Sequence, residues 1–401
     1  MIRRIIYFFL LLVSFAFPAS SQSFADAVKD GFSPLNALLK KGNAKNGGNE
    51  VNAEIKKVVL KDGTEYEGEM KGKRPHGTGK AVYKNGDVYE GEFQNGQRNG
   101  SGIYVFKDGE RYEGEFKDGK QHGKGVFRFS DGRVYDGNWV DDFQHGYGRM
   151  EFPNGDVYVG NWDSDERSGA GSYFYVDGSS YVGEWKDDVR HGMGVCIWPD
   201  NSRYSGTFSN GMRCGKGKYV SADSTFIYDG SWLNNMYEGH GHLYFANGDT
   251  YEGVFKAGKF DGHGKYVSAD GSSYEGNFLK GVRSGHGVMY FSEGAKYDGA
   301  WRNGMFNGKG KYTWANGDVY EGEWKNGMMH GSGVLRRHNG IKYKGGFVEG
   351  LEHGAGVAED ASGKRYEGTF EKGVRHGKFV VKDKNGKVLQ ECVYNSGNTI
   401  K

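Results

Sequence analysis

Apolar and polar residues alternate with a period of two in short runs along most of this chain. In one such run, Tyr112, Gly114 and Phe116 alternate with Glu113 and Glu115. An extended segment places successive side chains on opposite faces. The run therefore predicts a β-strand with one apolar face and one charged face.

A second run follows directly and completes a hairpin. Asp118-Gly119 is a dipeptide typical of tight turns. After it, Gly123, Gly125 and Phe127 occupy alternate positions, so we expect a second strand whose paired glycines share the face of the tyrosine. Glycine is unfavourable inside strands. Its recurrence at the same position of each unit therefore implies that a larger side chain there would collide with the rings.

This hairpin pattern recurs at a fixed spacing. A tyrosine followed two residues later by glycine recurs every 23 residues, with a single step of 24 between Tyr204 and Tyr228. The series is Tyr66, Tyr89, Tyr112, Tyr135, Tyr158, Tyr181, Tyr204, Tyr228, Tyr251, Tyr274, Tyr297, Tyr320, Tyr343 and Tyr366. Such a period indicates a stacked array of one small unit. We predict an all-β fold, an elongated single-layer antiparallel β-meander of about fourteen hairpins, with a bulge or bend at residues 222–226 where the spacing slips.

The ends of the chain differ from the array. Arg3 and Arg4 precede an apolar run that Pro18 ends, so residues 1–21 are predicted to be a cleaved signal peptide. The alternative is an uncleaved N-terminal membrane anchor. We expect a linker at residues 22–53 with a short helix near Leu35–Lys41, an N-terminal cap at 54–65, the repeats at 66–382, and a C-terminal cap strand and tail at 383–401.

The composition fits a thin sheet rather than a thick core. The chain of 401 residues has 70 glycines and 5 prolines, and 15% of it is aromatic. Removing residues 1–21 leaves equal numbers of basic and acidic residues, and no basic cluster is present, so nucleic acid is not an expected partner. Cys196, Cys214 and Cys392 are too few and too scattered for a disulfide framework, and we expect free thiols.

The repeated polar residues do not predict catalysis. Seven histidines share the tenth position after the tyrosine: His76, His122, His145, His191, His330, His353 and His376. Equivalent residues of neighbouring units lie about 9.6 Å apart, too far to share a metal ion, so the histidines are expected to flank turns. Paired glutamates such as Glu113 and Glu115 recur too often to form a unique acid–base site. The chain is therefore predicted to have no catalytic residues, no metal and no cofactor.

The complete unit, Y-x-G-x-W/F-x-x-G-x-x-H-G-x-G, resembles the MORN (membrane occupation and recognition nexus) repeat over residues 66–379. The resemblance implies an extended, twisted single-layer sheet. It also implies roles in scaffolding, protein–protein contact, dimerisation and association with membranes or phosphoinositides. The family is mostly known from intracellular eukaryotic proteins with added enzymatic domains, whereas this chain carries a predicted export signal and looks more like exported bacterial all-MORN chains.

The aromatic row of the second strands is the candidate binding surface. Its rings toward the strand ends are Tyr104, Phe106, Phe127, Phe129, Tyr173, Tyr175, Trp198, Tyr312 and Trp314. Open aromatic strips are typical of contact sites, although the same rings also serve as core. The leading hypothesis is an exported, non-catalytic scaffold that binds an unidentified protein partner. The alternatives are peripheral membrane or cell-envelope attachment through lipid or glycan, a glycan-binding or hydrolytic role, and homodimerisation through the terminal strand near Tyr394.

Overall fold

The computed structural model describes residues 55–400, which form one unit. The predicted signal peptide at residues 1–21 and the linker at 22–53, with its short helix, lie outside the described residues. No helix occurs among residues 55–400, and hence none there is able to cross a membrane.

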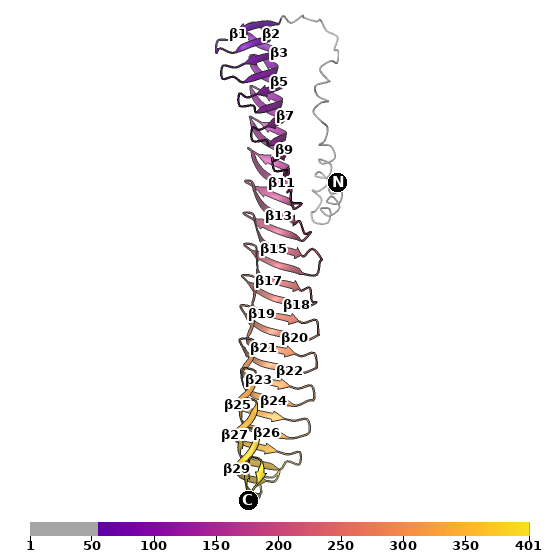
Figure 1. Cartoon of the computed structure of the whole chain (residues 1–401), viewed down its shortest axis with the longest axis vertical. Helices are drawn as coiled ribbons and strands as arrows, with labels where there is room; N and C mark the ends of the chain where they lie inside the picture. Colours follow the sequence, from indigo (N-terminus) through magenta and orange to yellow (C-terminus); the bar gives the residue numbers. More distant parts are fainter. Residues whose placement is uncertain (1–54, 401) are drawn as a thin grey trace. The chain divides into compact units, whose positions relative to one another are not determined.

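The described residues form a single open sheet in which every strand pairs antiparallel with the next strand in the sequence (Figure 1). The strands are β1 (Lys56–Val59), β2 (Glu65–Lys71), β3 (Arg74–Val82), β4 (Val88–Gln94), β5 (Gln97–Val105), β6 (Arg111–Lys117), β7 (Lys120–Arg128), β8 (Val134–Val140), β9 (Phe143–Glu151), β10 (Val157–Asp163), β11 (Glu166–Phe174), β12 (Ser180–Lys186), β13 (Val189–Ile197), β14 (Arg203–Ser209), β15 (Met212–Val220), β16 (Ile227–Leu233), β17 (Met236–Tyr244), β18 (Thr250–Lys256), β19 (Lys259–Val267), β20 (Ser273–Leu279), β21 (Val282–Tyr290), β22 (Lys296–Arg302), β23 (Met305–Thr313), β24 (Val319–Lys325), β25 (Met328–Arg336), β26 (Lys342–Val348), β27 (Leu351–Glu359), β28 (Arg365–Glu371), β29 (Val374–Lys382), β30 (Val388–Asn395) and β31 (Asn398–Thr399). The all-β hairpin meander is confirmed.

Each hairpin closes through a two-residue turn. In the β6–β7 hairpin, Lys117 pairs with Lys120, and the intervening Asp118 and Gly119 have φ values of 50° and 85°. Two successive positive φ angles match the right-handed twist of the flanking strands, which is why Asp-Gly and Asn-Gly dipeptides recur here. The tight turn predicted at this dipeptide is confirmed.

The second strand of each hairpin carries a bulge that the alternating pattern did not predict. Gly114 pairs with Gly125, but the next residue, Glu115, pairs with His122, so the second strand has two extra residues at this point. Gly123 lies in the bulge with a φ of 62°, and a Cβ there would meet the Glu115 carboxylate on the charged face. The expectation that Gly123 shares the tyrosine face is wrong, because the positive φ turns it away from that face.

The other glycine of the pair lies as expected. A Cβ built on Gly125 would overlap the ring and the hydroxyl of Tyr112. The same holds for the equivalent glycines of other repeats, including Gly148 under Tyr135 and Gly171 under Tyr158. A bare backbone is therefore required for the tyrosine to lie flat on the sheet, as the sequence predicted.

The core is a line of rings on one face of the sheet. Tyr112 is fully buried and meets Phe116 of its own hairpin edge-on, with centroids 5.0 Å apart and an interplanar angle of 86°. It also meets Trp139 of the next hairpin at 5.3 Å and 84°. Edge-to-face contacts of this kind are the favoured geometry for aromatic pairs. Because each repeat tyrosine from Tyr89 to Tyr343 is held between two such rings, the core runs along the array from one hairpin to the next.

The two ends of the array break the ring pattern. At the start, Val58 of β1 pairs with Tyr66 of β2. At the other end, Phe379 takes the place of the paired glycine and lies opposite Gly368, where its ring occupies the space above that glycine. Tyr394 of β30 packs edge-on against Phe379 at 5.1 Å. The last strands thus cover the final ring of the core.

The extra residue in the 24-residue step lies in a turn. Tyr219 pairs with Tyr228 and Val220 with Ile227, and the β15–β16 pairing contains no register shift. The following loop closes with the Ser221 amide donating to the Phe226 carbonyl at 2.9 Å, one residue wider than the equivalent closure between Phe152 and Asp156. The bulge predicted at residues 222–226 is wrong, because a connecting turn accepts an extra residue without disturbing the strands it joins.

Candidate binding groove

The apolar face of the sheet carries a channel that we call the ring groove. One side is formed by the residue nine positions after each tyrosine, such as Gln121 and Gln144. The other side is formed by the residues fifteen and seventeen positions after it, such as Phe127 and Phe129. The rings four positions after each tyrosine, such as Trp139, form the floor.

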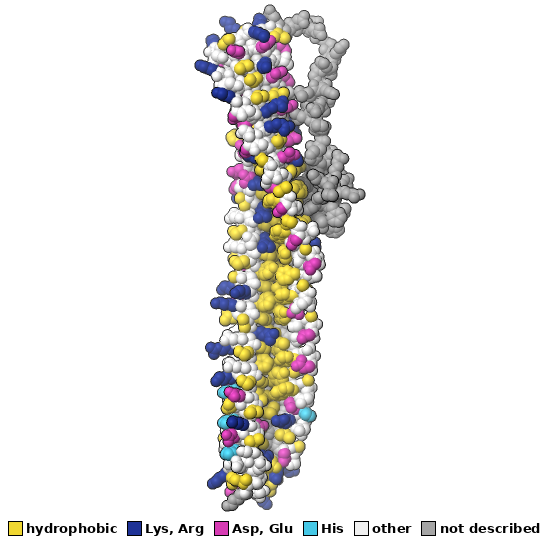
Figure 2. All heavy atoms as spheres, viewed as in Figure 1, with side chains coloured by type: hydrophobic (Ala, Val, Ile, Leu, Met, Phe, Trp, Pro, Cys, Tyr) yellow, Lys and Arg dark blue, Asp and Glu magenta, His cyan; other side chains and the backbone are white. Residues whose placement is uncertain are grey.

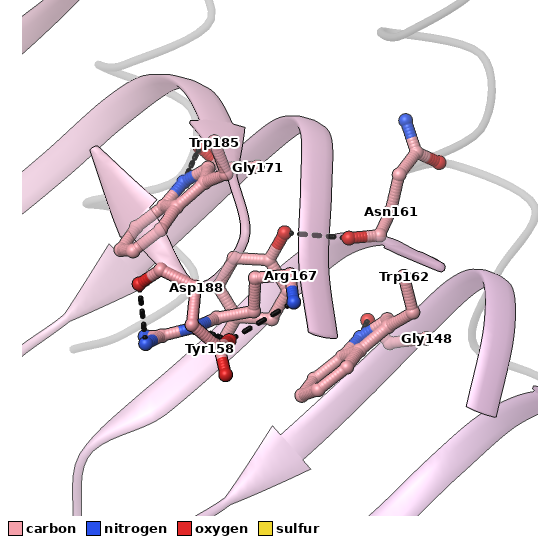
Figure 3. Close-up of polar contacts among 8 residues, drawn as sticks. All are labelled: Gly148, Tyr158, Asn161, Trp162, Arg167, Gly171, Trp185 and Asp188. Carbon is pink, nitrogen blue, oxygen red and sulfur yellow. Dashed lines mark hydrogen bonds and ion pairs between the residues drawn. The ribbon is translucent and has the colours of Figure 1, made fainter. Parts of the chain in front are cut away.

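The tyrosine hydroxyls hold the floor of the groove to the backbone. Tyr158 Oη donates to the Asn161 carbonyl at 2.9 Å, beside the bulge (Figure 3). The equivalent bond is present in every repeat from Tyr66 to Tyr343. The bulge leaves this carbonyl outside the regular ladder, and a buried carbonyl without a donor is costly. Burial raises the pKa of each of these phenols, that of Tyr66 to about 12.

The tryptophans of the floor are fixed in the same manner. Trp162 Nε1 donates to the Gly148 carbonyl at 3.4 Å and Trp185 Nε1 to the Gly171 carbonyl at 3.2 Å (Figure 3). Trp139, Trp232, Trp301 and Trp324 make the same bond to the glycine of the preceding hairpin. The floor is therefore preorganised by hydrogen bonds as well as by packing.

Arginines cover the rings along part of the groove. The Arg167 guanidinium lies 4.4 Å from the ring centroid of Trp185, while its Nε donates to Asp188 Oδ1 at 2.7 Å (Figure 3). Arg98 lies 4.5 Å from the Tyr104 ring and Arg213 lies 4.4 Å from the Trp232 ring. Such stacking on aromatic faces is favourable for the planar guanidinium.

The chemistry of the groove changes along the array. The row nine residues after the tyrosine is polar from Arg98 to Arg213 and mostly apolar from Tyr237 to Met329. The polar members are Arg98, Gln121, Gln144, Arg167, Arg190 and Arg213, and the next members are Tyr237, Phe260, Arg283, Phe306 and Met329. Figure 2 shows the resulting strip of hydrophobic side chains over β17–β23, interrupted by a basic side chain. The change falls at the 24-residue step.

Buried aspartates tie successive turns together on one side of the groove. Asp87 accepts hydrogen bonds from the Tyr104 hydroxyl at 2.6 Å and from the Lys107 amide at 2.9 Å. Asp156 accepts from Tyr173 and Val176 in the same arrangement. Burial favours the protonated acid, but the hydrogen bonds outweigh it and hold the pKa of Asp87 below its usual value.

The glutamates of the charged face also have a structural role. Glu115 Oε1 accepts from the Lys124 amide at 3.2 Å, and Glu184 accepts from the Met193 amide at 3.0 Å. These amides belong to the bulge. The recurring glutamate thus satisfies a backbone donor that the ladder leaves open.

The histidines and cysteines lie apart from one another. His122 Nδ1 lies 4.0 Å from Asp141 and His145 Nδ1 lies 3.5 Å from Asp163, each beside a turn. Within residues 55–400, no group of three or more His, Cys, Asp or Glu side chains is placed to hold a metal ion. The cysteines are free; Cys196 and Cys392 are buried and Cys214 is partly exposed.

The structure places the nine predicted binding residues on the groove face in separate groups. Tyr104, Phe127 and Tyr173 are buried, whereas Phe106, Phe129, Tyr175, Trp198, Tyr312 and Trp314 are partly buried and pack against the core. Tyr104, Phe106, Phe127 and Phe129 form one chain of ring contacts with centroids 4.4–5.7 Å apart. Tyr173 contacts Tyr175, and Tyr312 contacts Trp314, at 4.4 and 4.7 Å.

Two cavities lie along the groove. The first, of about 670 Å³, includes the chain of rings from Tyr104 to Phe129 together with Gln121, Gln144 and Asp142. The second, of about 1030 Å³, lies beside the 24-residue step and includes Trp198. The polar members were not predicted as site residues. A two-residue turn at Asp118-Gly119 places Gln121 opposite Phe116 and hence on the groove face. The sequence therefore contained the information needed to predict Gln121 as a groove residue.

A sheet of repeated hairpins with a ring-lined groove defines a repeat-array protein. The profile of the MORN repeat matches residues 66–88, 89–111, 112–132, 135–157, 158–180, 181–203, 204–226, 228–250, 251–273, 274–296, 297–319, 320–342, 343–365 and 366–378. The chain therefore belongs to the MORN repeat family, as the resemblance of its repeat unit predicted. A search of curated proteins found no match.

Solved structures similar to this chain include two domains in complex with other proteins' segments. One is the SAS-4 (dCPAP) TCP domain of Drosophila melanogaster in complex with a proline-rich motif of Ana2, at 11% identity and a TM-score of 0.25, covering 45% of this chain and 92% of that one. Another is the TCP10 domain of Danio rerio CPAP with a STIL peptide, at 12% identity and a TM-score of 0.13, covering 74% and 96%. TM-scores this low do not support a comparison of function.

Proposed function

We propose that this MORN repeat protein is a non-catalytic interaction protein that binds an extended segment of a partner protein along the ring groove. The observation that carries the proposal is the preorganised aromatic floor, fixed in repeat after repeat by tyrosine and tryptophan hydrogen bonds. Rigid aromatic surfaces of this kind bind with little loss of conformational entropy.

The form of the groove favours an elongated ligand over a compact one. Both cavities are open channels that span several consecutive hairpins rather than closed pockets. A compact substrate would contact only a small part of such a surface, whereas an extended chain contacts several repeats at once. Affinity then comes from many similar contacts.

Export of the protein is a separate part of the proposal. It rests on the charged, apolar and small-residue order of residues 1–21. We expect the mature chain to begin after Ser21. Mass spectrometry of the N-terminus of the natively produced protein tests this, and a chain that retains Met1–Ser21 would support the membrane-anchor alternative instead.

Photocrosslinking distinguishes the groove from the other face. A photoreactive phenylalanine analogue at Tyr175, in the groove, is expected to capture a partner from native extract. The same analogue at Tyr244 or Tyr290, which are exposed on the opposite face, is the matched control. Crosslinks that form equally from both faces, or only from the control positions, would contradict binding in the groove.

A second candidate function is attachment to a lipid surface along one edge. The residue eight positions after the tyrosine lies beside each hairpin turn and is an exposed apolar side chain at Met212, Met236, Val282, Met305, Met328, Leu351 and Val374. Such a row is unusual on a free surface. Co-sedimentation with liposomes tests this candidate, and loss of binding when Met305 and Met328 are replaced by lysine would support it.

A further inference from the structure

The groove between Arg98 and Asp188 contains two largely buried glutamines whose side-chain amides face the channel. Gln121 and Gln144 are 7% and 5% exposed, and both line the cavity of about 670 Å³. Their main-chain amides donate to Asp142 and Asp165 at 2.7 Å. Their side-chain amides have no hydrogen-bond partner among the described residues.

The amide atoms are not among the fully buried side-chain atoms that lack a hydrogen-bond partner, so they face the open channel. A ligand that lies in the channel covers these amides and must supply their hydrogen bonds, because a covered amide without a partner is costly. Tyr237 and Phe260 occupy the same row in the second half of the array, so the row itself does not require a polar residue. The two glutamines are therefore suited to a ligand that offers hydrogen-bond acceptors between aromatic walls.

The spacing of the repeats selects the conformation of that ligand. Equivalent residues of successive hairpins are separated by two strand spacings, about 9.6 Å. A polyproline II helix presents the same face every three residues, about 9.3 Å along its axis. An extended β-strand repeats its face at about 6.8 Å and an α-helix turns every 5.4 Å, so neither stays in phase with the two glutamines.

The polyproline II backbone also fits the chemistry of the site. It makes no internal hydrogen bonds, so its carbonyls remain available to the glutamine Nε2 groups. Proline rings pack well in aromatic grooves, as in other modules that bind such segments. Phe127, Phe129 and Phe152 on one side of the cavity, with Trp139 and Trp162 on its floor, supply these surfaces.

One edge of the cavity carries carboxylates. Arg98, Arg133 and Arg167 also line the cavity, but Arg133 is paired with Asp131 and Arg167 with Asp188. Three consecutive hairpin turns carry carboxylates at the positions where most other repeats have glycine or a neutral residue. These are Asp141, Asp142, Asp165, Asp187 and Asp188, with Glu166 beside them. Of the cavity residues on this edge, Asp188 is paired with Arg167, while Asp142 and Asp165 each accept a single backbone amide. A basic ligand is complementary to this edge.

We propose that the groove from Arg98 to Asp188 binds a proline-rich segment in the polyproline II conformation, with arginine or lysine near its ends. The inference rests on the proposed groove-binding function and names the partner class for its first half. Gln121 and Gln144 donate to carbonyls three residues apart, and the acidic turns hold the basic flanks.

The test is fluorescence anisotropy with the full chain and labelled peptides. The probe is an oligoproline flanked by arginines. The controls are a glycine–serine peptide with the same arginines, an oligoproline flanked by glutamates, and labelled cello-oligosaccharide. Saturable binding of the arginine-flanked oligoproline, at least tenfold tighter than that of any control, is the expected result.

Substitutions by residues that other repeats carry at the same position test the roles of the glutamines and the aspartates. Gln121→Met with Gln144→Met copies Met329 of the same row and removes the amides, and it is expected to weaken oligoproline binding about tenfold. The matched control, Met329→Gln, is expected to leave binding unchanged. Asp142→Asn with Asp165→Asn copies Asn235, which accepts from the Arg213 amide at 2.8 Å, so the turn is kept while the charge is lost. This variant should reduce the salt dependence of binding.

Several results would overturn the inference. If the glycine–serine peptide binds as tightly as the oligoproline, the arginines alone account for binding. If cello-oligosaccharide binds more tightly than the oligoproline, the groove is a glycan site. An unchanged affinity in the double methionine variant removes the glutamines from the site. If oligoproline does not bind while Tyr175 still crosslinks a partner, the partner class is wrong and groove binding stands. If both fail, groove binding falls as well.

Discussion

At the scale of the residue, one tyrosine in each repeat combines three structural roles. Tyr112 fills the space above Gly125, contacts two rings edge-on and donates its hydroxyl to the Glu115 carbonyl at 2.9 Å. Phenylalanine would keep the first two roles and lose the third. The hydroxyl explains why tyrosine alone occupies this position, while either phenylalanine or tryptophan stands four residues later in every repeat but the first.

Replacing this tyrosine by phenylalanine should isolate the hydroxyl. Tyr112→Phe is expected to destabilise the array by about 1–3 kcal/mol, because the Glu115 carbonyl loses its phenolic donor. Urea unfolding monitored by circular dichroism measures the change. Tyr366→Phe is the matched control, since that tyrosine is only partly buried and its hydroxyl makes no hydrogen bond to the described residues. Equal effects of the two substitutions would contradict this role.

The buried tyrosines also predict an alkaline transition. Burial raises the pKa of Tyr66 and Tyr274 to about 12, whereas an unfolded tyrosine titrates near pH 10. The unfolded chain therefore releases protons first, and stability that is full below about pH 10 falls as the pH rises toward 12. The share of the tyrosinate absorbance that comes from the buried tyrosines should rise together with loss of the sheet signal. Development of the full tyrosinate absorbance while the sheet signal persists would contradict burial of these tyrosines.

At the scale of the element, the hairpin is defined by its turn and its bulge. The positive φ angles at Asp118 and Gly119 close the strands, and the extra residues near Gly123 reset the pairing so that Gln121 returns to the groove face. The Glu115 carboxylate and the Tyr112 hydroxyl satisfy the backbone groups that the bulge releases. Turn, bulge and ring thus depend on one another within each hairpin.

A side chain at the paired glycine should disrupt the hairpin locally. Gly125→Val places its Cβ into the Tyr112 ring, and overpacking of this kind costs about 1–3 kcal/mol or more. Hydrogen exchange should show loss of protection in β6–β8 and little change far along the array. Lys124→Val, on the neighbouring position of the bulge, controls for the gain of a branched side chain. Unchanged thermal unfolding of Gly125→Val would contradict the packing of the ring on the backbone.

At the scale of the whole molecule, the described residues behave as a one-dimensional array. Every internal hairpin contacts the hairpins before and after it, and the line of rings crosses from one hairpin to the next. Stability in such arrays is close to a sum of unit and neighbour terms. The difference between the polar first half of the groove and the apolar second half is then a difference in surface chemistry on a uniform scaffold.

Removal of one complete unit should preserve the fold. Deleting residues 251–273 joins Thr250 to Tyr274 in the same strand register, so the array is expected to stay folded with a similar unfolding midpoint. Deleting residues 254–275 instead joins Gly253 to Gly276 within a strand, which leaves one extra residue between the tyrosine and the ring four positions later and turns that ring to the wrong face. Calorimetry should show a clear loss of stability only for the second deletion. Unfolding of both would contradict an additive array.

The sequence determined the architecture because its signals are local and repeated. The alternation around Tyr112 predicts the strands, the Asp118-Gly119 dipeptide predicts the turn, and the constant period predicts the array. These features depend only on residues that are close together along the chain. The candidate aromatic residues were likewise placed on the groove face. Gly125 was predicted correctly from the requirement for space beneath a ring.

Tertiary structure decided what depends on contacts across strands. The bulge turns Gly123 to the charged face, and the wider turn before Phe226 accommodates the twenty-fourth residue; neither is visible in a pattern of alternation. The same cross-strand geometry places the Gln121 and Gln144 side chains in the groove. A period of two specifies a face, whereas pairing between strands decides which backbone groups are left open and which side chains satisfy them.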